Sequence, residues 1–271
     1  MFTVMGRDAY ARVIAHGLDR MPKHINSASR LFAISEKIAA AKDDAPTLEV
    51  WGNIFGLPNE PTSAVEVCRR LIWINEEIDA MVAQMRATHF SEHLYLKPAK
   101  GMRNASAPTA IGGQARSIKG ACSEPVRNGL EYCAEALPNE EERVSPESIK
   151  ALENLVAELK ALVAQADIPD HLRHLVQRHI DLLQAALDAL PIKGVKSLIE
   201  AALAASGQLG YLAAEDADKT TDADPEIREK VLGMLKRTWT TVGKTIDVAA
   251  KTQKALALGY AAYKAVEVIL Q

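Results

Sequence analysis

The chain has 271 residues, enough for one large domain or two of modest size. Its 48% apolar and 25% charged residues are typical of a soluble globular protein with a sizeable core. The formal net charge of −3 implies no particular partner by itself.

Helix is the expected secondary structure almost throughout. Aromatic residues are scarce at 5%, Ala and Leu dominate the apolar set, and apolar residues recur at three- and four-residue spacing. In the N-terminal half this spacing predicts helices over residues 10–18, 31–38 and 48–55. A longer helix is predicted over 63–87, where Ser63 and Glu66 have the spacing of a capping box.

Residues 97–120, KPAKGMRNASAPTAIGGQARSIKG, differ in composition and hydrophobic periodicity from the predicted helices around them. They are rich in Gly, Ala, Ser and Pro and have weak periodicity, which predicts a long loop and a boundary between halves. The segment carries five basic residues and no acidic one, so it is a candidate for contact with phosphate or another anion. The candidate contacts are Lys97, Lys100, Arg103, Arg116 and Lys119. A solvated loop that balances an acidic body is the alternative, and the lack of interleaved aromatics favours it.

The C-terminal half has cleaner helical patterns. A helix is expected over 123–137, others begin near Pro146, Pro169 and Pro191, and a polar acidic connection follows at 215–225. A last helix begins near Pro225 and extends almost to residue 271. We therefore predict an all-α, multi-helix bundle of about eight to ten helices with a long basic loop near the middle. Its expected parts are an irregular helical region over 1–121 and a bundle over 122–271.

The chemistry-bearing residues form no strong motif. HFSEH places His89 and His93 four apart and matches a short zinc-peptidase pattern, but no spacing singles out a third ligand. The three cysteines lack C-x-x-C spacing, and no nucleophile has a local base. We expect no metal and no cofactor, and a binding protein is favoured over an enzyme.

The C-terminal segment is the most distinctive part of the sequence. Residues 230–271 hold seven basic and two acidic residues, yet residues 255–263 hold no charge, and the helix there becomes apolar nearly all round. The uncharged run is too short to span a bilayer, for which about 20 apolar residues are needed. The segment is expected to enter the protein's own core, to contact a partner or second copy, or to lie at a membrane surface. Its candidate contact residues are Leu256, Leu258, Tyr260, Tyr263, Val266, Ile269 and Leu270.

Three functional hypotheses follow from these features. The first is a non-enzymatic interaction or scaffold protein whose C-terminal helix joins a homo-oligomer or a protein partner. The second is a membrane-active, toxin-like or defence effector that uses the same helix. The third is a nucleic-acid or nucleotide binder that uses residues 97–120, and it is the least favoured. The N-terminus lacks the pattern of a secretory signal, so a cytoplasmic protein is expected, with peripheral contact to the inner face of the membrane as an option. The segment VWGNIFGL ahead of a Leu-rich bundle is similar to helical proteins of bacteria, a resemblance that assigns no site.

Overall fold

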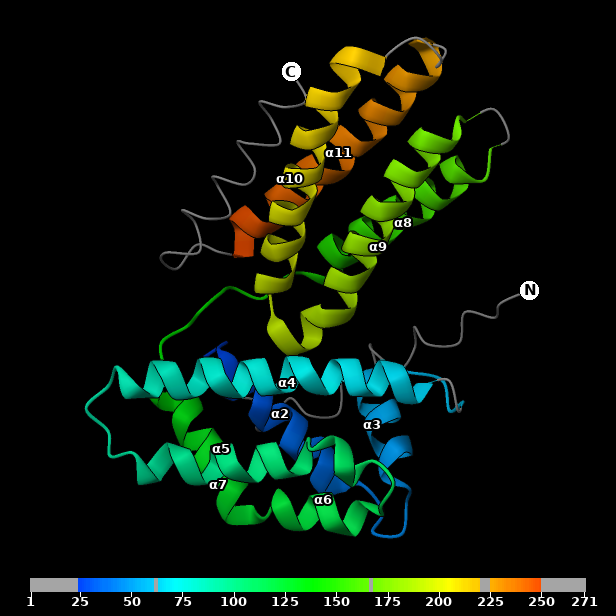
Figure 1. Cartoon of the computed structure of the whole chain (residues 1–271). Helices are drawn as coiled ribbons and strands as arrows, with labels where there is room; N and C mark the ends of the chain where they lie inside the picture. Colours follow the sequence, from blue (N-terminus) through cyan, green and yellow to red (C-terminus); the bar gives the residue numbers. More distant parts are fainter. Residues whose placement is uncertain (1–23, 61–62, 166–167, 220–224, 250–271) are drawn as a thin grey trace. The chain divides into compact units, whose positions relative to one another are not determined.

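The computed structural model describes residues 24–60, 63–165, 168–219 and 225–249. These residues form ten α-helices and one short 3-10 helix and contain no β-strand, so the predicted all-α class is confirmed. The chain divides into two compact units, residues 1–139 and 140–271, whose helices are labelled in Figure 1. The helix predicted over residues 10–18 lies outside the described residues.

The first unit is built around one long helix, α4, which packs against shorter ones (Figure 1). Helix α4 contacts α2, α3 and α5, and α5 also contacts α6 and α7. The described helices of this unit are α2 (Ser27–Ala40), α3 (Thr47–Phe55), α4 (Ser63–Arg86), α5 (His93–Ala105), η2 (Pro108–Ala110), α6 (Ala115–Ala121) and α7 (Glu124–Ala136).

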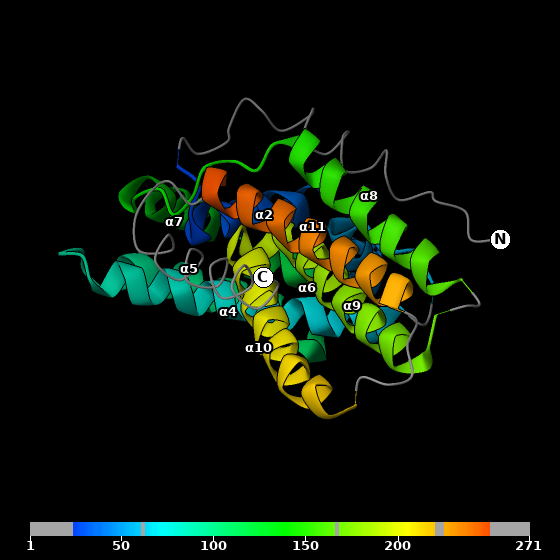
Figure 2. The same ribbon diagram turned by 90° about the horizontal axis from the view of Figure 1, so that it is seen from above.

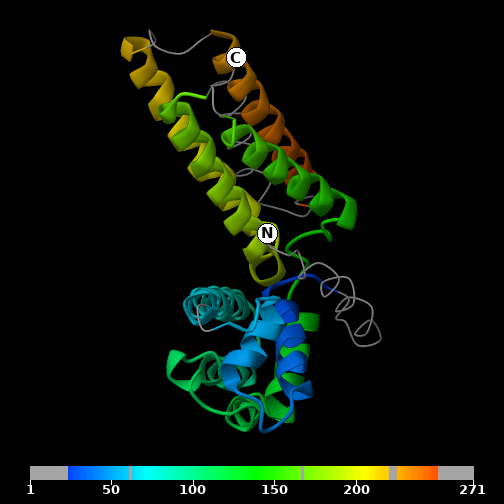
Figure 3. The ribbon, with the colours of Figure 1, turned by 90° about the vertical axis from the view of Figure 1, so that its right-hand side faces the viewer.

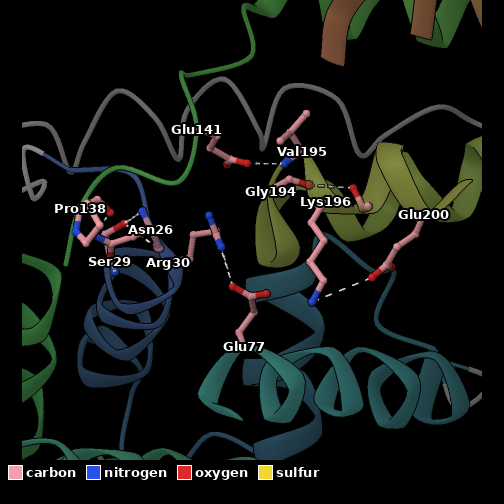
Figure 4. Close-up of polar contacts among 11 residues, drawn as sticks. Asn26, Ser29, Arg30, Glu77, Pro138, Glu141, Gly194, Val195, Lys196 and Glu200 are labelled. Carbon is pink, nitrogen blue, oxygen red and sulfur yellow. Dashed lines mark hydrogen bonds and ion pairs between the residues drawn. The ribbon is translucent and has the colours of Figure 1, made fainter. Parts of the chain in front are cut away.

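The apolar stripe of α4 forms the centre of this unit's core. Its predicted members are all buried: Val67, Leu71, Ile74, Ile78, Met81 and Met85. The same face carries Glu77, whose carboxylate lies 2.7 Å from the guanidinium of Arg30 on α2 (Figure 4). A buried charge needs such a partner, so this ion pair fixes how α2 lies against α4.

The start of α2 is fastened to the end of α7 by one asparagine. Asn26 is the N-cap of α2, and its side chain accepts a hydrogen bond from the backbone N–H of Ser29. Its side-chain amide also donates to the carbonyl oxygens of Ala134 and Leu137 (Figure 4 shows Asn26 and Ser29). Two helices far apart in the sequence therefore share one buried polar contact.

Helix α7 belongs to the first unit, whereas the sequence analysis placed the division of the chain at about residue 121. The helix packs on α2 and α5, and its residues Leu130 and Cys133 are fully buried. The apolar face of α7 packs on α2 and α5 of this unit, so the division falls after α7, between Asn139 and Glu140.

The long loop predicted over 97–120 is wrong: most of this segment is helical, in α5, η2 and α6. Its small residues serve close packing instead of flexibility. A Cβ on Gly101 would lie 2.7 Å from the carbonyl oxygen of Ala121, and a Cβ on Gly129 of α7 would lie 2.9 Å from Pro98. Glycine and proline commonly break helices, but here they let α5 approach its neighbours.

The second unit consists of four long helices. They are α8 (Pro146–Val163), α9 (Asp170–Lys193), α10 (Lys196–Lys219) and α11 (Pro225–Ala249). Helix α9 contacts α8, α10 and α11, and α11 also contacts α8 and α10. Figure 2 shows α11 beside α8 and α9, and Figure 3 shows the yellow α10 along α9. Their leucine, valine and isoleucine stripes meet in one buried core, as expected for a bundle.

The break between α9 and α10 falls three residues later than predicted. Pro191 was expected to begin a new helix, but α9 continues through it to Lys193. Gly194 supplies the break, with φ of 62° and ψ of −155°, a conformation open almost only to glycine. The acidic stretch expected to begin a connection at residue 215 is also helical, as far as Lys219.

Residues 140–145, which precede α8, are held by hydrogen bonds to the start of α10 and the end of α11. The carboxylate of Glu141 accepts a hydrogen bond of 2.6 Å from the backbone N–H of Val195, just before α10 begins (Figure 4). A Cβ on Gly194 would collide with this carboxylate. The N–H of Glu142 donates to the carbonyl oxygen of Ala249 at the end of α11.

Candidate functional site: a cationic groove between α4 and α5

A surface groove of about 330 Å³ lies between α4 and α5 in the first unit. Both helices contribute residues that recur at three- or four-residue spacing, so each presents one face to the groove. The lining residues are Asp79, Val82, Ala83 and Arg86 from α4, and Leu96, Ala99, Lys100, Arg103 and Asn104 from α5.

The groove combines apolar and cationic surface. Val82 and Ala99 are buried, and the small side chains of Ala83 and Ala99 leave room between the helices. Leu96 is a partly exposed apolar residue beside them, at 37% exposure. The side chains of Arg86, Lys100 and Arg103 are exposed around this apolar surface.

The three cations of the groove differ in their pairing. Arg103 forms an ion pair with Asp79 across the groove, where both side chains are solvent-accessible. Within the described part of the chain, neither Arg86 nor Lys100 has a carboxylate within ion-pair distance. Arg86 and Lys100, one from each helix, are therefore available to an incoming anion. Arg103 could exchange Asp79 for that anion.

The geometry suits an amphipathic anion. Unpaired Arg and Lys bind carboxylate or phosphate through charge-assisted hydrogen bonds, and Arg can do so with two parallel bonds. The apolar floor would favour a ligand that also carries hydrocarbon, because removing apolar surface from water on both sides lowers the free energy of the complex. From Asp79 to Arg86 the groove runs along about 10 Å of helix, roughly two turns.

The five predicted anion contacts lie in three places. Lys100 and Arg103 line the groove. Lys97 is exposed on α5 outside the set that lines it. Arg116 and Lys119 lie on α6.

The two basic residues of α6 serve the loop between α2 and α3. The ammonium of Lys119 lies 2.7 Å from the carbonyl oxygen of Ala41 and 2.6 Å from the carboxylate of Asp43, and the backbone N–H of Arg116 donates to the backbone carbonyl oxygen of Asp43. The hydrogen bond and charge of Lys119, with a smaller contribution from Arg116, lower the pKa of Asp43. Lys119 is thus engaged within the protein.

Sequence reasoning missed Asp79 and Arg86. Both lie on α4, seven residues apart and with Val82 and Ala83 between them, a spacing that a helix places on one face. The signal was available once α4 had been predicted. What the sequence did not contain was the pairing of this face with α5.

The predicted contact residues at the C-terminus lie outside the described part of the chain. They are Leu256, Leu258, Tyr260, Tyr263, Val266, Ile269 and Leu270. Their role stays a prediction. Of the helices that the structure describes, none has both the length and the apolar character needed to cross a bilayer.

The two candidate metal ligands, His89 and His93, both lie at the surface. His89 is exposed and stacks on Phe90, with ring centroids 4.6 Å apart, and His93 is exposed at the start of α5. The described residues include no group of three or more His, Cys, Asp or Glu side chains placed to hold a metal ion. Burial raises the pKa of Cys122 to about 12 and that of Cys133 to about 11, so both thiols are protonated at neutral pH.

Comparison with known proteins adds no assignment to this geometry: no family model, no curated protein and no solved structure matches the chain.

Proposed function

We propose that this protein is a non-enzymatic helical interaction protein whose groove between α4 and α5 receives an acidic, amphipathic segment of a protein partner. The observation that carries the proposal is the pair of cations, Arg86 and Lys100, which lie on either side of an apolar floor and have no ion-pair partner among the described residues. Docking of an amphipathic helix into a groove between two helices is a common mode of peptide recognition.

The apolar floor favours a protein segment over a nucleic acid. A duplex is held mainly by rows of cations that contact successive phosphates, and a single strand needs aromatic side chains for base stacking. Of the described residues that line this groove, none is aromatic, and Asp79 places a negative charge among the cations. An acidic peptide would instead bury its apolar face on Leu96 and Ala83, the exposed apolar residues of the groove, and direct its carboxylates to Arg86 and Lys100.

The proposal predicts binding of a fluorescein-labelled amphipathic peptide of about 18 residues, long enough to form a helix, with Glu on one face and Leu on the other. Binding is measured by fluorescence anisotropy on the full chain. Arg86→Glu and Lys100→Glu should each weaken binding by about tenfold or more, because each reverses a charge that faces the peptide's carboxylates. Binding should also weaken as salt screens these charges.

Lys97→Glu is the matched control, since Lys97 is an exposed, unpaired lysine of α5 that does not line the groove. It should change the affinity by less than about threefold. Equal losses in all three variants would mean that the peptide responds only to net charge, and the groove would be rejected. A single-stranded oligonucleotide serves as competitor. If it binds more tightly than the peptide and with the same dependence on Arg86, the ligand is a nucleic acid.

A further inference from the structure

Helix α4 carries a second exposed surface, at the end of the helix away from the groove. Val65 is 72% exposed and Ile72 is 60% exposed, and they are the two most exposed large apolar residues among those described. They lie seven residues apart and so on the same face of the helix, where Trp73 is half-buried beside Ile72. Single exposed apolar residues are common, so these two mark an interaction surface only together with the charges around them.

The charges of this stripe have opposite signs on the two sides of Ile72. Arg69 lies between Val65 and Ile72, and Glu76 lies one turn beyond Ile72; both are exposed, and Glu76 also takes part in an interaction within its own chain. Arg69 is 3.2 Å from Glu66, but that carboxylate is also held by Arg70, which donates to it at 3.1 Å. Arg69, with its side chain 61% exposed, is therefore able to reach a second acidic group.

We propose that this stripe of α4 is an interface with a second copy of the chain, packed antiparallel about a twofold axis that passes between Ile72 and Trp73. In an isologous contact each pair of facing residues occurs twice. The axis places Ile72 of one copy against Trp73 of the other and Arg69 against Glu76 of the other, on both sides of the centre. Val65 then faces Ala80, a small and half-buried residue.

The self-complementary pattern is the reason for choosing a second copy as the occupant. Along α4 the stripe has a basic residue, Arg69, on one side of Ile72 and an acidic residue, Glu76, on the other. Two copies of it bring opposite charges together only when one copy is turned by 180° relative to the other. The contact spans residues 65–80, about 24 Å of helix, so its buried area lies near the lower limit of about 1,000 Å² for specific interfaces. We therefore expect a weak dimer, with a dissociation constant of about 10–100 µM.

Sedimentation equilibrium of the full chain from about 5 to about 500 µM tests the proposal, because this range brackets the expected dissociation constant. Ile72→Glu should weaken the dimer at least about tenfold by placing two carboxylates at its centre. Arg69→Glu and Glu76→Arg should each weaken it similarly, since each creates two repulsive pairs. Lys97→Glu on α5 is the control and should leave it unchanged.

Mixing the two charge-reversed variants gives the sharpest result. An Arg69→Glu chain facing a Glu76→Arg chain recovers opposite charges at both positions, so the mixture should dimerise about as well as the native protein. Circular dichroism melting curves establish that each variant is folded. Three results would overturn the proposal: a native protein that stays monomeric at about 500 µM, a dimer insensitive to Ile72→Glu, or a mixture no stronger than its components.

Discussion

At the scale of single residues, His179 is a buried polar side chain of the second unit whose hydrogen bonding is only half satisfied among the described residues. Its ring lies in the apolar core, and its Nδ1 accepts a hydrogen bond of 3.2 Å from the indole N–H of Trp239. Within the described residues its Nε2 has no hydrogen-bond partner. The ring is fully buried on α9, and only one of its two nitrogens is satisfied.

This environment predicts an acid-sensitive stability. Burial lowers the pKa of His179 from its ordinary value of 6.5 to about 4. The unfolded chain therefore binds a proton at higher pH than the folded chain, so the contribution is fully present above about pH 6.5. It is lost as the pH falls toward about 4, and the loss amounts to about 3 kcal/mol. Protonation would also place an N–H opposite the indole donor and remove the hydrogen bond.

Urea unfolding at several pH values between 4 and 7 measures this contribution. His179→Gln keeps an acceptor for Trp239 but does not titrate, so its free energy of unfolding should fall less than that of the native protein over this range. His174→Gln, an exposed histidine on the same helix, should behave like the native protein. Equal pH dependence for His179→Gln and the native protein would show that His179 titrates normally.

At the scale of elements, the sequence predicted helices well wherever an apolar stripe was continuous. The helices expected at 63–87 and 123–137 are observed over Ser63–Arg86 and Glu124–Ala136. Between them the pattern failed, because α5 buries only Tyr95 and Met102 as large side chains and fills the rest of its buried face with Pro98 and small residues such as Ala99, Gly101 and Ala105. Hydrophobic periodicity measures burial of large side chains and does not detect a helix that is buried through small ones.

The close approach of α5 to α6 and α7 predicts a large cost for one added methyl group. Gly101→Ala would place its Cβ 2.7 Å from the carbonyl oxygen of Ala121 and equally close to Val126, so a backbone or a packed side chain must move. We expect the free energy of unfolding to fall by about 1–3 kcal/mol, despite the higher helix propensity of alanine.

Gly120→Ala in α6 is the matched control for this substitution. A Cβ there would meet no atom within 4 Å, so the change should be neutral or stabilise by up to about 1 kcal/mol. Both variants are compared by urea unfolding against the native protein. A stable Gly101→Ala protein would mean that α5 and its neighbours lie farther apart than the structure shows.

At the scale of the whole molecule, the sequence predicted two helical parts but not which residues of different helices meet. Lys100 and Arg103 were found as basic residues of one segment, whereas Arg86 joins them only because α4 lies beside α5. The same holds for Arg30 and Glu77, which pair across 47 positions of the chain. Local patterns fix helices, but the pairing of their faces depends on the packing of all helices together.

The two units have separate apolar cores, and each contains one fully buried tryptophan. Trp51 is 0% exposed in the first unit and Trp239 is 2% exposed in the second. Replacing the other two tryptophans by phenylalanine in each case gives one protein that reports on the first unit and one that reports on the second. Leu235 and Ile74, both fully buried, lie in the second and first cores, respectively.

We expect Leu235→Ala to lower the stability that Trp239 reports by about 2–5 kcal/mol, because it leaves a cavity among the helices of the second unit. The transition that Trp51 reports should move by less than about 0.5 kcal/mol, as for sites that share no contacts. Ile74→Ala should give the reverse pattern in the same urea titrations. If either substitution shifts both transitions equally, the two cores unfold as one cooperative unit, and the division at residue 139 describes geometry without energetic independence.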